Sequence, residues 1–134
     1  MFSKRPHQPT AATRSTMNKL MQRTAFWVAA TLVGALSLAP VAELPAQAFN
    51  VWDKAQHTAG FTVLTLLGGL AYPGSHGKTL IGLFVYGALI EVAQSATGWR
   101  NGDLLDLLAD AVGVWLGALV LAIARPRSRR SRPQ

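Results

Sequence analysis

The stretch Glu91–Asp110, EVAQSATGWRNGDLLDLLAD, joins two long apolar runs of the chain and contains five charged side chains. The run before it begins at Thr79, and the run after it continues to Ala124. A charged side chain inside a membrane span is costly unless it faces other protein groups or a water-filled cavity. The stretch therefore predicts two packed helices that turn Glu91 and Asp110 towards a shared interior.

The rest of the chain follows the same pattern. Half of its 134 residues are hydrophobic, and they are concentrated in runs that are apolar on almost every side, with no alternation of period two. At ~1.5 Å per residue, helices of this length cover the ~30 Å of hydrocarbon in a bilayer. The expected fold is an all-α, integral membrane four-helix bundle. Its spans cover about residues 18–39, 52–72, 79–97 and 104–124.

The two ends of the chain are expected to be disordered basic tails, 1–18 and 125–134, around a four-span domain of residues 19–124. Met17 is an alternative start. The first span also resembles a signal peptide, with Ala46-Gln47-Ala48 as a cleavage site, although a retained helix is favoured. The Arg-rich C-terminal run contains no interleaved aromatic residues, so it predicts binding to anionic lipid rather than to nucleic acid.

The distribution of charge predicts the orientation. With the N-terminus in the cytoplasm, both basic tails and Lys78 lie inside, and every acid of the chain lies outside with only Lys54 and Arg100. This arrangement obeys the positive-inside rule. Trp52 and Trp99 then lie at the outer interface, where aromatic side chains are enriched. Both termini are therefore expected in the cytoplasm.

The polar residues of three spans share one depth and one side of each helix. Glu91 and Gln94 lie on the face of Gly87 and Gly98, while Asp103, Asp106 and Asp110 share a face with Gly113-x-x-x-Gly117. Asp53 and His57 form a third face. His57, Glu91 and Asp110 each lie ~8–9 Å below the outer end of their helix. These faces predict a polar pocket that is open to the outside and is closed beneath by tight glycine packing.

These motifs resemble those of the VanZ-like family of small bacterial membrane proteins. The shared elements, over about Leu36 to Ala118, are Asp53-Lys54 with His57, Glu91 with Gln94, and Arg100 followed by Asp106, Ala109 and Gly113. In the family the position of Asp110 is usually Asn, so this chain adds a charge there. The resemblance implies a multi-pass protein of the bacterial cytoplasmic membrane. The founding member is linked to low-level teicoplanin resistance.

The sequence favours a binding function for the pocket, with an envelope lipid headgroup or a cell-wall precursor as the ligand. The expected ligand-binding residues are Asp53, Lys54, His57, Glu91, Gln94, Arg100, Asp106 and Asp110. Arg100 is expected to clamp a phosphate or carboxylate. Two alternatives remain: Glu91 or His57 acts as a general base on a phosphate- or ester-bearing lipid, or the charges are structural and a protein partner carries the function.

No metal site and no cofactor are predicted. Only His57 among the three histidines lies on the outer side, and zinc sites usually need two or more nitrogen or sulfur ligands. The absence of cysteine excludes thiolate ligands and disulfides. The acids Glu91, Asp106 and Asp110 offer oxygen ligands suited to Mg²⁺ or Ca²⁺.

Overall fold

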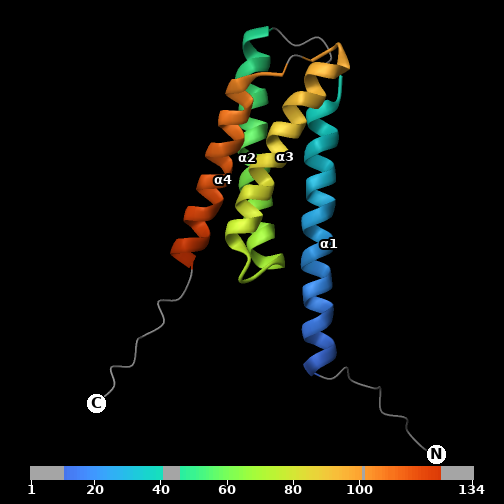
Figure 1. Ribbon diagram of the computed structural model, residues 1–134, viewed down its shortest axis with the longest axis vertical. Coiled ribbons are helices and arrows are strands. Elements are labelled where there is room, and N and C mark those ends of the chain that lie inside the picture. Colours follow the sequence, from blue (N-terminus) through green and yellow to red (C-terminus); the bar gives the residue numbers. More distant parts are fainter. Residues whose placement is uncertain (1–10, 41–45, 101, 125–134) are drawn as a thin grey trace, which may run out of the picture.

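The computed structural model describes residues 11–40, 46–100 and 102–124. Within these ranges every regular element is an α-helix, and there is no strand, which confirms the all-α class. The helices run alternately up and down, so that Ala11 and Ala124 lie towards the same end of the bundle (Figure 1). The elements are α1 (Ala11–Leu38), α2 (Ala46–Ala71), α3 (His76–Thr97) and α4 (Leu104–Ala124).

The helices extend further at their N-terminal ends than the apolar runs do. α1 begins at Ala11, inside the stretch expected as a tail, and α2 begins at Ala46, so that the alternative cleavage site lies in its first turn. Gln, Lys, Arg and Met are good helix formers, so a helix need not stop where the apolar run stops. α4 has the predicted bounds. The predicted tails at 1–10 and 125–134 lie outside the described residues.

α2 is the central helix, and its most extensive contact is with α4. α3 contacts the other three helices, whereas the described parts of α1 and α4 do not touch each other. Gly117 allows the close approach of α4, because a Cβ there would lie 2.6 Å from Cβ of Thr65 and 2.9 Å from the carbonyl oxygen of Thr62. The Thr62 hydroxyl donates across the same interface to the carbonyl of Gly113 at 3.1 Å.

The buried core lies between α1, α2 and α3. Phe61 and Leu64 of α2 are fully enclosed, and Phe26, Leu83 and Ile90 pack around them. The hydroxyl of Tyr86 donates to the carbonyl of Ala30 at 2.6 Å and joins α3 to α1. This core fixes the positions of three of the helices below the polar residues.

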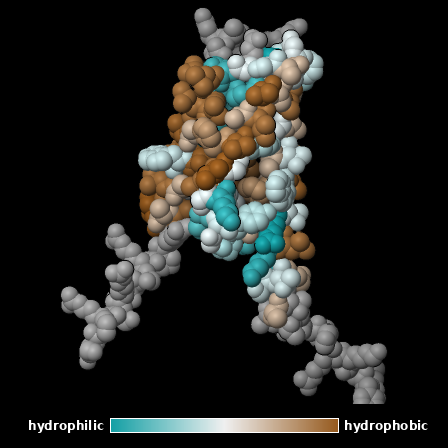
Figure 2. All heavy atoms as spheres, in the orientation of Figure 1, coloured by the Kyte–Doolittle hydropathy of each residue, from teal (hydrophilic) through white to brown (hydrophobic). Residues whose placement is uncertain are grey.

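The outside of the bundle is strongly apolar. On α4, Leu104 and Ile123 are 72% and 75% exposed, and Figure 2 shows hydrophobic side chains over much of the face that this helix forms. α3 and α4 are long and apolar enough to cross a membrane, and little of either is buried. The described parts of α1 and α2 do not reach the same hydropathy. Two of the four described helices thus have the length and hydropathy that were expected of all four membrane spans.

Candidate functional site

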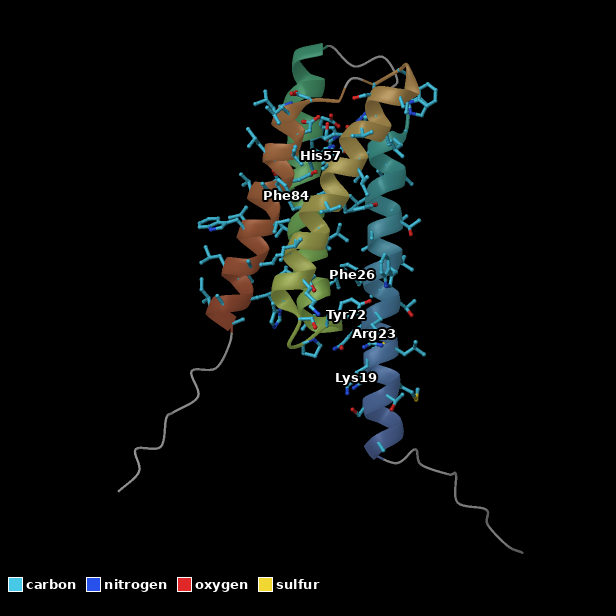
Figure 3. All side chains as sticks on the ribbon, viewed as in Figure 1. Lys19, Arg23, Phe26, His57, Tyr72 and Phe84 are labelled. Carbon is cyan, nitrogen blue, oxygen red and sulfur yellow. The ribbon has the colours of Figure 1, made fainter. Side chains whose placement is uncertain are left out.

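The acids of α2, α3 and α4 meet Lys54, His57 and Arg100 at one end of the bundle, where Figure 3 labels His57. We call this set the polar cluster. It consists of Asp53, Lys54, His57, Glu91, Arg100, Asp103, Asp106 and Asp110. Four of its residues that helical spacing places on inward faces, Asp53, His57, Asp106 and Asp110, are all buried.

At the lower level of the cluster, His57 and Asp110 form a buried pair between α2 and α4. Nδ1 of His57 lies 2.8 Å from Oδ1 of Asp110, and both side chains are almost completely enclosed. Gly87 of α3 provides the space for this carboxylate, because a Cβ there would lie 2.5 Å from Oδ2 of Asp110. The pairing explains why a glycine precedes Glu91 by one helical turn.

At the upper level, two bases hold three acids. The ammonium group of Lys54 donates to Asp103 at 2.9 Å and to Asp106 at 3.0 Å. The guanidinium group of Arg100 donates through both terminal nitrogens to one oxygen of Asp53, at 2.7 and 3.2 Å. Asp53 therefore already occupies the carboxylate position that Arg100 was expected to offer to a ligand. These pairs join the start of α2 to the connection before α4.

Glu91 contacts the backbone of this connection. One carboxylate oxygen, Oε2, accepts the N–H of Asp103 at 2.8 Å. The side chain of Asp103 in turn accepts the N–H of Leu105 at 2.9 Å and so caps α4. The bond from Leu105 and the Lys54 ammonium hold the pKa of Asp103 below its ordinary value. Glu91 and Asp103 together fix the entry of the chain into α4.

Gln94 connects the cluster side of α3 to α1. Its amide nitrogen donates to the carbonyl of Ser37 at 2.9 Å, and its side chain is buried. Trp99 donates its indole N–H to the neighbouring carbonyl of Leu38 at 3.2 Å. Gly98 ends α3 with a φ of 78°, a left-handed conformation that glycine adopts without strain. These contacts hold the end of α1 against α3.

Four buried polar atoms in this region have no hydrogen-bond partner. They are Nε2 of His57, Oε1 of Glu91, Oε1 of Gln94 and Oδ2 of Asp110. Leaving such a group unpaired costs about 1–3 kcal/mol. Native proteins leave few of them, and each needs a reason, such as a ligand, an ion or a catalytic role. Their concentration on residues that the sequence selects for the site marks this region as the functional candidate.

The side chains also form two sets with the spacing of metal ligands. One set is Asp53, His57 and Asp106, and the other is His57, Glu91 and Asp110. Within each set the potential ligand atoms lie within 4.8 Å of one another. The second set confirms that His57, Glu91 and Asp110 share one depth in the bundle. Sequence reasoning predicted no metal site, because zinc sites usually need two or more nitrogen or sulfur ligands, but the folded chain places carboxylates around the imidazole of His57.

Sequence reasoning missed several residues that position the site. Asp103 was expected as one acid of a helical face, whereas its N–H also holds Glu91 and its carboxylate caps α4. Thr58 and Thr62 bond to carbonyls of α4, at Ala109 and Gly113. The spacing of Thr58, Thr62 and Thr65 along one helical face is a signal that would have found this interface. The contact between Gln94 and Ser37 has no such signal, because it depends on how α1 is placed.

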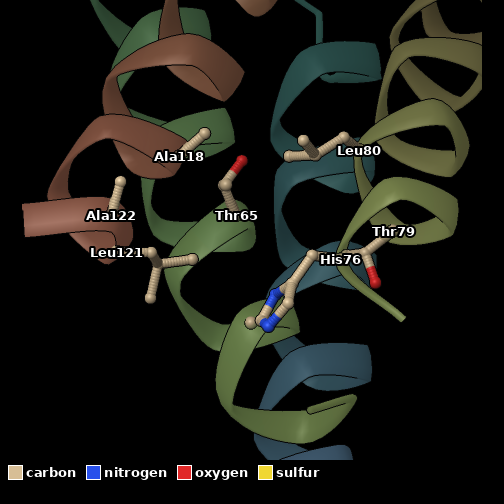
Figure 4. A pocket seen from close by; sticks show the side chains of 8 residues that line it. Thr65, His76, Thr79, Leu80, Ala118, Leu121 and Ala122 are labelled. Atoms are coloured by element: carbon tan, nitrogen blue, oxygen red, sulfur yellow. The ribbon is translucent and has the colours of Figure 1, made fainter. Parts of the chain in front are cut away.

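A cavity lies away from the cluster, near the opposite ends of α2, α3 and α4 (Figure 4). It measures about 180 Å³. Thr65, His76 and Leu121 are among the residues that line it, and the polar cluster contributes none of its lining. The tight contact expected beneath the cluster is present at Gly113 and Gly117, and the packing loosens again further along the bundle.

Comparison with known proteins gives one match. The family model described as VanZ/LLP1 matches residues 3–125, which is nearly the whole chain. No curated protein and no solved structure matches the chain. The match covers all four helices and the entire polar cluster, and it confirms the family that the sequence motifs indicate. The chain belongs to the VanZ/LLP1 family.

Proposed function

We propose that the chain is a multi-pass protein of the bacterial cytoplasmic membrane, with both termini in the cytoplasm and the polar cluster at the outer surface. The exposed apolar faces of α3 and α4 support membrane insertion, since a water-soluble bundle would bury such faces. Lys19 and Arg23 lie at the end of the bundle opposite His57 (Figure 3), which agrees with the positive-inside rule.

We further propose that the polar cluster binds the headgroup of an envelope lipid or a related cell-wall precursor. The observation that carries this proposal is the set of four unpartnered buried atoms. Three of them, on Glu91, Gln94 and Asp110, are oxygens that accept hydrogen bonds. A ligand that offers hydroxyl or ammonium donors, as sugar and ethanolamine headgroups do, would satisfy them when the side chains that enclose them move apart.

The charge of the cluster favours the same kind of ligand. Its five acids outnumber Lys54, Arg100 and His57, even when His57 is protonated. Arg100 and Lys54 are also engaged by Asp53, Asp103 and Asp106, so the bases of the cluster already have acidic partners. The excess of acids favours amine-bearing and neutral polyhydroxy headgroups over bare phosphates.

Native mass spectrometry of the detergent-purified protein tests this proposal. The parent is compared with Glu91→Gln and with Asp103→Asn. Asp103 is the control because its carboxylate already binds Lys54 and the N–H of Leu105 and has no unpartnered buried atom. A discrete lipid or precursor adduct is expected on the parent and on Asp103→Asn, and not on folded Glu91→Gln. An adduct of equal abundance on both variants, or no adduct on the parent, would contradict the proposal.

A second candidate function is hydrolysis or transfer of a lipid ester. The observation that favours it is the orientation of His57, whose one nitrogen is held by Asp110 while the other has no partner. A histidine held in this way is suited to act as a general base, and Glu91 lies beside it. Turnover of a defined lipid that is lost in His57→Gln would support catalysis. No turnover across a broad lipid panel would contradict it.

A role in glycopeptide resistance rests on the family alone. Expression of the chain in a susceptible bacterium is expected to raise the teicoplanin concentration that stops growth. Glu91→Gln, produced at the same level, should not raise it if the polar cluster is responsible. Equal protection by the parent and the variant would show that resistance does not require the polar cluster. If the parent gives no protection, the chain has no role in resistance.

A further inference from the structure

We propose that His57, Glu91 and Asp110 bind a single divalent transition-metal ion, with Zn²⁺ or Mn²⁺ as the class of cation. The three side chains come from α2, α3 and α4, so the ion would join the three helices at the level of the buried pair. The ion would use unpartnered oxygens of Glu91 and Asp110 that the headgroup proposal also uses, but its test does not require a bound lipid.

The first support is geometric. Potential ligand atoms of the three residues lie within 4.8 Å of one another. Metal ligands of this type bind at about 2.0–2.2 Å, so the atoms need to close by about an ångström around an ion.

The second support is independent of this spacing. Both acids keep one buried carboxylate oxygen without a hydrogen-bond partner, Oε1 of Glu91 and Oδ2 of Asp110. The imidazole would bind the ion through Nδ1, the nitrogen that faces Asp110. His57 and Asp110 are almost completely enclosed, so bulk water does not reach these atoms. A cation would satisfy the carboxylate oxygens and offset the excess of negative charge in the cluster.

The neighbouring set, Asp53 with His57 and Asp106, is a weaker candidate. The carboxylate of Asp53 accepts both terminal nitrogens of Arg100, and Asp106 accepts the ammonium group of Lys54. These acids already have cationic partners, so they gain less from a metal ion. The donors of the proposed site are one imidazole nitrogen and carboxylate oxygens. Such a mixed set suits Zn²⁺ or Mn²⁺ better than Ca²⁺, which prefers oxygen ligands alone.

The test is equilibrium dialysis of the purified full-length chain against Zn²⁺, followed by elemental analysis. One ion per chain is expected on the parent. Glu91→Gln should weaken binding by at least about tenfold, as loss of a metal-site group does. Asp103→Asn removes one acid outside both sets and should weaken it by less than about fivefold, the effect of an exposed charge. No stoichiometric binding to the parent, or equal losses in the two variants, would overturn the proposal.

Two further measurements test which side chains bind the ion. Binding that follows Asp106→Asn rather than Glu91→Gln would overturn the assignment of ligands. If Glu91→Gln does not fold, Mn²⁺ bound to the parent can be examined by electron spin echo modulation. We expect a coupling between Mn²⁺ and one imidazole nitrogen. This coupling should be lost in His57→Gln and retained in His76→Gln. Absence of the coupling, or its loss with His76, would also overturn the proposal. A missing lipid adduct leaves these measurements unaffected, so the two proposals fail separately.

Discussion

At the scale of single residues, the polar cluster combines paired and unpaired groups. Lys54 and Arg100 each bind acids directly, and His57 bonds to Asp110. A buried ion pair contributes little net stability, because the loss of hydration offsets the attraction between the charges. Removal of one partner is nevertheless costly, since it leaves the other buried without compensation. The residues of the cluster therefore depend on one another.

The pair of His57 and Asp110 provides the first prediction. Asp110→Asn keeps an oxygen that accepts from Nδ1 of His57, so the free energy of unfolding should fall by only about 1 kcal/mol. Asp110→Leu leaves Nδ1 of His57 without any partner and should cost about 1–3 kcal/mol more than Asp110→Asn. Denaturation of the detergent-purified protein by dodecyl sulfate measures both. Equal losses in the two variants would show that the hydrogen bond does not hold the pair.

The helix cap provides the second prediction. Asp103→Ala removes the acceptor for the N–H of Leu105 and should lower the free energy of unfolding by about 1 kcal/mol. Asp103→Asn should retain most of this stability, since Asn caps helices as well as Asp does. Thermal unfolding followed by circular dichroism makes the comparison. A loss in Asp103→Asn as large as that in Asp103→Ala would assign the effect to the charge instead.

Acid pH separates the charge of Asp103 from its role as a cap. Because the pKa of Asp103 is lower in the folded protein, ionised Asp103 stabilises the fold fully above the ordinary Asp pKa of about 3.9. This stabilisation is lost as the pH falls through the folded pKa. Asp103→Asn should therefore lose less stability than the parent over that acid range. Parallel pH profiles for the two proteins would contradict the role of the carboxylate.

At the scale of helices, the contact between α2 and α4 depends on small residues. The third prediction is that Gly117→Val destabilises the bundle by about 1–3 kcal/mol, because the added atoms overlap Thr65 and the carbonyl of Thr62. Gly82→Ala is the matched control, since its Cβ meets nothing within 4 Å. That change should stabilise the helix by about 0.5–1 kcal/mol. Similar effects at the two positions would contradict close packing between α2 and α4.

The sequence predicts the helices and their buried faces well for identifiable reasons. Asp106, Asp110, Gly113 and Gly117 are the buried residues of α4, and they are the face that helical spacing indicates. α1 and α2 begin before the apolar runs from which the spans were predicted, because hydropathy detects apolar runs rather than helices. The partners within the cluster could not be predicted. Spacing brings acids to one level, but only the packing decides which of them meets Arg100 or Lys54.

At the scale of the whole molecule, the orientation in the membrane is the fourth prediction. The chain has no cysteine, so single cysteines can be introduced without background labelling. Ala96→Cys, near the polar cluster, should react with an impermeant maleimide in intact cells. Ser75→Cys, between α2 and α3 at the other end of the bundle, should react only after permeabilisation. Both positions are exposed. The reverse pattern would contradict the proposed orientation.

The central claim is that the polar cluster receives something from outside the chain. The most direct measurement is an experimental structure, at a resolution that shows ordered ligands, of the protein purified from its own membrane. We expect density that does not belong to the chain in contact with the unpartnered atoms of His57, Glu91 and Asp110. If these three side chains instead bond only to one another and to the rest of the protein, the cluster is a structural device, and the account of its function is wrong.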